Sequence, residues 1–247
     1  MGCVLPVKRS QSASRVLAVL EKIAAHQPIG VSELARQVGA DKSAVQRAIM
    51  TLADGGWISA APVKPTRWEL TPRIQVVAHE AHGNHDLRHR ARKALETLRD
   101  ESGESVLLNV PDSGRFVVID VLESRQYLRT VIPIGTIVPL RGSATARAIM
   151  PYMTSERLVE FLGEQPDPAL LKDFAETRAR GYSISNGGVV VGSTNVAAPV
   201  FEVDGRPVAA VCISGPSDRV TATEFARLGA MVAATAKRVS RGAPAHA

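Results

Sequence analysis

A run of polar side chains at residues 42–47 has the chemistry to bind the edges of nucleotide bases. Its members that donate hydrogen bonds, or are small enough to approach a base, are Lys42, Ser43, Ala44, Gln46 and Arg47. Lysine and arginine suit O6 and N7 of guanine, glutamine suits adenine, and a small alanine can contact the thymine methyl group. Such a set reads bases only from the exposed end of a helix that fits the major groove. The surrounding sequence must therefore supply that helix.

The first 55 residues predict three short helices, with the polar run at the start of the third. Apolar residues at helical spacing place these helices over 12–27, 31–38 and 42–54. Gly30 is the expected N-cap of the second helix, Gly39 ends it, and Asp41 is the expected N-cap of the third. Two short helices joined by a glycine-containing turn are typical of a helix-turn-helix, whose second helix reads DNA with its first residues.

A β-hairpin is predicted directly after the third helix. Residues 57–70 contain two short strand-like runs around a tip rich in proline, with Lys64 and Arg67 near that tip. A hairpin in this position is a wing, and its basic side chains are placed for phosphate or the minor groove. Arg15, near the start of the first helix, is a further candidate for a phosphate contact.

The positive charge is concentrated in the part of the chain that holds these elements. Residues 1–99 contain 15 Lys and Arg against 8 Asp and Glu, whereas residues 100–247 contain 15 against 16. A module that binds a polyanion concentrates its basic residues in this way. We therefore predict that residues 1–71 form a winged helix-turn-helix that binds double-stranded DNA.

The rest of the chain predicts a helical linker and a mixed α/β domain. Residues 72–100 have helical character, with an interruption expected near Gly83-Asn84, and residues 101–247 contain the α/β domain. Its expected strands are 104–110, 115–123, 127–133, 196–203 and 206–214, the last two within a strand-like stretch over 181–218. Its expected helices are one that begins near Ser143 and three that cover about 155–163, 168–180 and 221–241. Asp204-Gly205 is a hairpin turn, so we expect a mainly antiparallel sheet and an α+β fold overall.

Catalytic machinery is not apparent in the second domain. The sequence contains no G-x-S-x-G elbow, no phosphate-binding P-loop and no G-x-G-x-x-G after a strand. Histidine, the commonest general base, is missing from residues 90–245. Cys212 lies in an apolar strand, where an inert buried thiol is expected. We therefore predict a protein that is not an enzyme and needs no cofactor.

Loops in the second domain favour the binding of a small molecule. Gly142, Ser143, Ala144 and Thr145 lie where a loop runs into a helix, and free N–H groups at such a junction suit a carboxylate. The polar, glycine-rich loops at 183–188 and 192–195 can line the same concavity. The alternative, that these loops only connect elements, is open at this point.

A cluster of histidines raises a second possibility. His79, His82, His85 and His89 have spacings of three and four residues, which can place two of them on one helix face as metal ligands. No cysteine or paired carboxylate accompanies them, and nearby arginines oppose a cation. We therefore expect no metal site, and the alternative is a metal-responsive regulator that uses the cluster from His79 to His89.

The cell compartment is predicted from what the sequence lacks. It contains two cysteines, too few for a disulfide scaffold, and no apolar run approaches the roughly 18 residues that a membrane span needs. The first residues do not form a secretory signal. We expect a cytoplasmic protein without a membrane partner.

The chain resembles the IclR family of bacterial transcriptional regulators along nearly its whole length. The segments SASRVLAVLEKIA, VSELARQVGADKSAVQRAIMTLADGGWI and WELTPRI resemble the winged helix-turn-helix of that family. The segments PIGTIVPLRGSATARAIM, TRARGYSIS and VAAPVFEVDGRPVAAVCISGPSDRVT resemble its effector domain, and the last of these is the most specific.

The resemblance implies a GAF-like domain that binds small organic acids or aromatic metabolites. It also implies a homodimer or a dimer of dimers on a palindromic operator. Carried over residue by residue, the effector pocket falls near Ala144, Thr145, Ser185 and Asn195. The chain departs from the family pattern at Arg141, where histidine is common, and at Gly188, where an acidic residue is common. The gain of a basic residue and the loss of a carboxylate would favour an anionic ligand.

Overall fold

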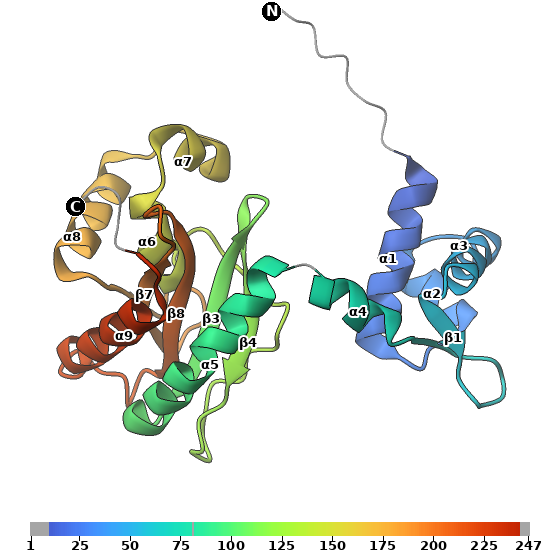
Figure 1. Cartoon of the computed structure of the whole chain (residues 1–247), viewed down its shortest axis with the longest axis horizontal. Coiled ribbons are helices and arrows are strands. Elements are labelled where there is room, and N and C mark those ends of the chain that lie inside the picture. The colour runs from blue at the N-terminus through green and yellow to red at the C-terminus, as the bar shows by residue number, and fades with distance from the viewer. Residues whose placement is uncertain (1–9, 81, 243–247) are drawn as a thin grey trace, which may run out of the picture. The chain divides into compact units, whose positions relative to one another are not determined.

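The fold consists of two units that divide between His85 and Asp86. It is known from a computed structural model that describes residues 10–80 and 82–242. The first unit contains helices α1 (Gln11–His26), α2 (Val31–Val38), α3 (Lys42–Asp54) and α4 (Arg73–Glu80), with strands β1 (Ile58–Ala60) and β2 (Trp68–Leu70) (Figure 1). The three helices and the following hairpin confirm the predicted winged helix-turn-helix.

The core of the first unit lies between α1, α2, α3 and the hairpin. Val19 and Ile23 of α1, Leu34 of α2, and Val45 and Ile49 of α3 are fully or almost fully buried there. The hairpin pairs in antiparallel register, from Ile58 opposite Leu70 to Ala60 opposite Trp68. Trp68 also exchanges two backbone hydrogen bonds with Ile29, which fixes the wing to the segment before α2.

A six-stranded sheet forms the centre of the second unit. Its strand order is β5-β4-β3-β8-β7-β6, and every neighbouring pair is antiparallel. The strands are β3 (Ser105–Asp112), β4 (Arg115–Leu122), β5 (Ile137–Val138), β6 (Ser183–Asn186), β7 (Ser193–Phe201) and β8 (Pro207–Pro216). The mainly antiparallel sheet and the α+β class are therefore confirmed.

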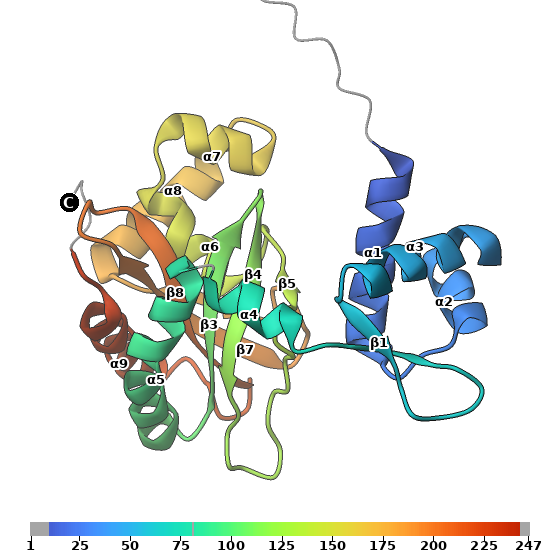
Figure 2. The ribbon, with the colours of Figure 1, turned by 45° about the vertical axis from the view of Figure 1, so that its right-hand side comes forward.

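Helices cover both faces of this sheet. They are α5 (His82–Ser102), α6 (Ala144–Ile149), the 3₁₀ turn η1 (Met150–Tyr152), α7 (Ser155–Leu162), α8 (Pro168–Arg180) and α9 (Phe225–Val239). The helices α5 and α9 pack on one face, and α6, α7 and α8 pack on the other (Figures 1 and 2). Because successive side chains of a strand point to opposite faces, covering both faces requires the nearly continuous apolar runs of β3, β7 and β8.

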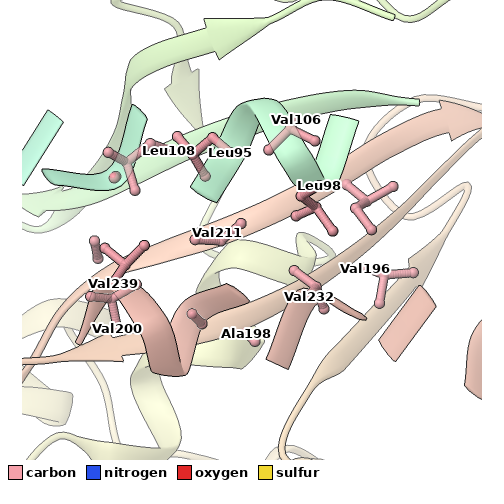
Figure 3. Close-up of a cluster of buried hydrophobic side chains, with 14 of the residues drawn as sticks. Leu95, Leu98, Val106, Leu108, Val196, Ala198, Val200, Val211, Val232 and Val239 are labelled. Carbon is pink, nitrogen blue, oxygen red and sulfur yellow. The ribbon is translucent and has the colours of Figure 1, made fainter. Parts of the chain in front are cut away.

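The face under α5 and α9 carries the larger apolar cluster. Leu95 and Leu98 of α5 meet Val106 and Leu108 of β3, and Val232 of α9 lies in the same cluster (Figure 3). The second half of the predicted linker is thus part of the second unit. Its arginines pair there too, because Arg90 binds Glu202 at 2.6 Å and Arg92 binds Asp120 at 3.3 Å.

Two local predictions, the strand at 127–133 and the start of the last helix, were wrong. Residues 127–133 form no strand, because Tyr127 and Leu128 point into solvent and side chains, not a neighbouring strand, bind the carbonyls of Leu128 and Thr130. The last helix begins at Phe225 and not after Thr221, since residues 222–224 form a turn. The interruption expected near Gly83-Asn84 agrees with the structure, in which α4 ends at Glu80 and α5 begins at His82.

Candidate DNA-reading helix and effector cavity

Asp41 sets the first turn of α3. Its carboxylate accepts hydrogen bonds from the Ser43 hydroxyl at 2.6 Å and from the Ala44 N–H at 2.8 Å. The Ser43 hydroxyl and the Ala44 N–H hold the pKa of Asp41 below its usual value. The predicted N-cap is therefore confirmed, and it fixes where the polar end of the helix begins.

Most of the predicted base-reading side chains share the exposed surface of α3. Lys42, Ser43, Gln46 and Arg47 are all exposed. The structure corrects one member of the set, because Ala44 is only 4% exposed and cannot reach a thymine methyl group.

Met50 was not among the predicted base-reading residues, although it lies one turn further along α3 and is 50% exposed. Helical spacing predicts this exposure, because Met50 does not lie on the face of α3 that contains the buried residues Val45, Ile49 and Leu52.

The wing and α1 place the remaining basic candidates differently. Lys64 is exposed at the tip of the hairpin. Arg67, in contrast, donates to the carbonyl of Pro28 at 2.9 Å and lies 3.9 Å from the Glu33 carboxylate. Its side chain thus fixes the wing to the helical core. Arg15 is partly exposed on α1.

A cavity of about 240 Å³ opens in the second unit on the face of the sheet opposite α5 and α9. Its floor is formed by β3, β4, β7 and β8, and its walls by residues 130–139, the start of α6 and residues 189–190. Four of the predicted effector residues line it: Ser143, Ala144, Thr145 and Asn195. Ser143 is the N-cap of α6, which begins at the predicted junction of loop and helix.

The other three predicted effector residues lie outside this cavity. Arg141 and Gly142 border a second cavity of about 280 Å³, and Arg141 is ion-paired with Glu164. The Ser185 hydroxyl donates to the carbonyl of Gly142. Gly142 has a φ of +79°, and a Cβ there would collide with the carbonyl of Gly188. These residues tie together two loops beside the cavity, and the anionic preference inferred from Arg141 loses its support.

The side chains that give the cavity its polar floor include two that sequence reasoning did not select. Asn109 of β3 is fully buried and donates its Nδ2–H to Thr145 Oγ1 at 3.0 Å. Cys212 of β8 also lines the cavity, and burial raises the pKa of its thiol to about 12, in agreement with an inert thiol. An asparagine inside the run VLLNV was the available signal, because asparagine is disfavoured in strands and rarely fully buried.

The loop over the cavity is held by two tethers. Ser105 of β3 donates to the carbonyl of Thr130 at 2.8 Å. Arg219 donates to the carbonyl of Leu128 at 2.8 Å while it grips the Glu104 carboxylate with two further hydrogen bonds, at 2.6 and 2.8 Å. The wall formed by residues 130–139 is therefore fixed to the sheet at its first residue.

Comparison with known proteins agrees with this architecture. Residues 12–62 match the IclR helix-turn-helix domain, and residues 79–241 match the C-terminal domain of the bacterial transcriptional regulator IclR. The chain belongs to the IclR family. Within that family it is 30% identical to the acetate operon repressor of Salmonella typhimurium, over 93% of this chain and 89% of the relative. It is 29% identical to the transcriptional repressor IclR of Escherichia coli K12, with the same coverage.

Solved structures of IclR proteins share the fold. The IclR of Thermotoga maritima is 24% identical, and the match covers 93% of this chain and 97% of that one with a TM-score of 0.72. An IclR homologue from Microbacterium hydrocarbonoxydans, complexed with 4-hydroxybenzoate, is 18% identical over 93% and 98% of the two chains, with a TM-score of 0.78. This IclR-family chain is thus a DNA-binding transcriptional regulator with an effector-binding domain.

Two further observations concern membranes and metals. Among the described residues of this IclR-family protein, no helix is long and apolar enough to cross a membrane. The side chains of His79, His82 and His85 lie outside the described residues, whereas His89 is exposed on α5. The metal-responsive alternative therefore stays a prediction.

Proposed function

We propose that this regulator acts in the cytoplasm, where it binds a palindromic operator as a homodimer or a dimer of dimers. Lys42, Gln46 and Arg47 of α3 read base edges, and Lys64 of the wing contacts phosphate. Their exposure supports these roles. The apolar side chain of Leu17, 60% exposed on α1, offers surface for contact between copies. A two-fold protein assembly corresponds to a palindromic site.

The controlling ligand is a small organic acid or aromatic metabolite bound in the 240 Å³ cavity. The observation that carries this proposal is that four predicted effector residues line a cavity within the effector domain. For scale, an engineered apolar cavity of about 150 Å³ binds benzene. The 4-hydroxybenzoate in the related Microbacterium structure agrees with this ligand class. The effector changes operator affinity to the extent that it binds one arrangement of the protein better than another.

A thermal-shift screen of the full chain against aromatic and aliphatic carboxylic acids tests this function. A ligand that binds only the folded protein raises its Tm as the concentration exceeds Kd. We expect a ligand whose Tm shift is smaller in Asn195→Leu and unchanged in Arg141→Gln, because Asn195 lines the cavity and Arg141 does not. A hit that depends on Arg141 and not on Asn195 would move the site to the second cavity. If no acid or aromatic compound binds, the proposed ligand class is wrong.

A further inference from the structure

Asn109 lines the cavity and carries an acceptor that has no partner among the described residues. Its side chain is fully buried, and its Nδ2–H is bound to Thr145, but its Oδ1 has no hydrogen-bond partner among the described residues. A buried carbonyl oxygen without a partner is unfavourable, so such groups in native proteins are normally satisfied by solvent or by a ligand. Asn109 is also one of the residues that line the cavity, so this oxygen belongs to a side chain in the cavity wall.

The neighbouring groups fix which end of the amide is free. The buried thiol of Cys212, whose pKa of about 12 keeps it protonated at neutral pH, donates to the carbonyl of Ile213 at 3.4 Å. The side chain of Thr145 is close enough to this thiol to lower its pKa, against the larger effect of burial, which raises it. In the structure, Thr145 Oγ1 accepts from Asn109 Nδ2–H at 3.0 Å. The amide oxygen of Asn109 is consequently the atom left for a ligand.

The sheet is distorted at this residue. The pairing of β3 with β4 runs from Leu108 opposite Asp120 to Asn109 opposite Val118, so Ile119 has no partner. A bulge of this kind redirects the side chains beside it and is common next to binding sites. It lies at the point where Asn109 enters the cavity.

The remaining lining sets the character of the ligand. The described residues that line the cavity carry no charge, and the walls beside Asn109 are apolar, with Leu107, Val118 and Val138 among them. An ionised carboxylate has no hydrogen to offer to a carbonyl oxygen and would bring two acceptors together. A neutral hydroxyl or N–H group supplies what Asn109 Oδ1 lacks.

We propose that the effector carries a hydroxyl or N–H group that donates to Asn109 Oδ1, on a small and largely apolar body. Asn109 thereby distinguishes effectors that have this donor from molecules that fit the cavity but lack it. This inference rests on the proposed function, because it takes the 240 Å³ cavity as the effector site.

Matched pairs of compounds test the proposal on the full chain. The two compounds of a pair share one body and differ only in a distal group, which is a hydroxyl in one and a methyl in the other. The bodies are an aromatic ring, a cyclohexane ring and a four-carbon chain, each as its carboxylate and as its amide. 4-Hydroxybenzoate against 4-methylbenzoate is one such pair. Isothermal titration calorimetry measures Kd. For a body that fits, we expect the hydroxyl compound to bind at least about tenfold more tightly, because its partner leaves Asn109 unpaired.

The variant Asn109→Leu should bring this ratio close to one. Thr177→Val is the matched control, because Thr177 is also fully buried but lies on α8 outside both cavities. We expect Thr177→Val to retain the wild-type ratio. Circular dichroism checks that both variants fold. If Asn109→Leu does not fold, the ratio of the two Kd values in the wild-type protein tests whether the cavity prefers the hydroxyl compound.

The outcomes separate the two proposals. Equal binding of hydroxyl and methyl partners, or a preference that survives Asn109→Leu, overturns the role of Asn109 and leaves the proposed effector site intact. If none of the compounds binds the wild-type protein, both the inference and the proposed ligand class fail.

Discussion

At the scale of single residues, the reading surface depends on which side chains of α3 the core leaves exposed. The core takes Ala44, Val45, Ala48, Ile49 and Leu52, which leaves Lys42, Gln46, Arg47 and Met50 exposed. Burial therefore decides that a thymine methyl contact, if the operator requires one, must come from a residue other than Ala44.

Gln46→Ala is expected to relax base preference at one operator position. Glutamine can make two hydrogen bonds to adenine, so we expect a loss of roughly 1–3 kcal/mol on the matched site and little loss on a site changed at that position. Fluorescence anisotropy with a panel of operator variants measures both.

The matched control is Lys64→Ala on the exposed wing tip. It should weaken binding to all sequences about equally and reduce the salt slope by about one. Equal losses for Gln46→Ala on every operator variant would show that Gln46 does not read a base. Arg67 is a poor control, because its bond to Pro28 also positions the wing.

At the scale of elements, α3 depends on the cap that begins it. Asp41 satisfies the N–H of Ala44 and holds the Ser43 hydroxyl, so the start of the helix is fixed by a carboxylate outside it. A charged cap makes the helix sensitive to acid.

Asp41→Asn is expected to remove part of this acid sensitivity. Because the pKa of Asp41 is lowered on folding, its carboxylate stabilises the fold above its usual value of 3.8, and this contribution disappears as the pH falls through the folded-state pKa. Asparagine also caps helices but does not titrate. The difference in urea midpoint between the wild-type protein and Asp41→Asn should therefore shrink below about pH 4.

Urea titrations monitored by circular dichroism, at pH intervals from neutral to about pH 2.5, would measure this difference in midpoint. A difference that stays constant across that range would show that the Asp41 carboxylate does not stabilise the fold through its charge. Asp41→Ala, which has no capping oxygen, should be less stable than Asp41→Asn at every pH.

At the scale of the whole molecule, regulation requires the two units to influence each other. Among the described residues, the unit that contains the helix-turn-helix and the unit that contains the cavity have separate apolar cores, since each buried cluster draws its residues from one unit. Any effect of the ligand on DNA binding is thus a coupling free energy between two distinct sites.

A saturating effector is expected to change operator affinity by a factor of about 5–150, the usual range of such couplings. The operator must change effector affinity by the same factor, because the coupling is reciprocal. Anisotropy with and without effector, and calorimetry with and without operator, measure the two factors. Gln46→Ala should leave the effector Kd of the free protein unchanged. An operator Kd that is the same with and without bound effector would contradict effector control.

Much of this protein is determined by local sequence. The periodic apolar residues, the cap Asp41 and the turn at Asp204-Gly205 predict most helices and strands, because each reflects interactions between residues close in the chain. The same local signals predict the polar head of α3 and the loop at Ser143–Thr145 that lines the cavity.

The tertiary structure alone decides the composition of the site. Asn109, Thr145 and Cys212 come from three separate elements, and they meet because of strand register and a one-residue bulge. Arg141 and Arg67 resemble binding residues in the sequence, yet the fold pairs each with a group far along the chain. Contacts of this kind depend on how distant segments pack and leave no periodic signal in the sequence. Tertiary structure therefore determines which polar group is left for a ligand.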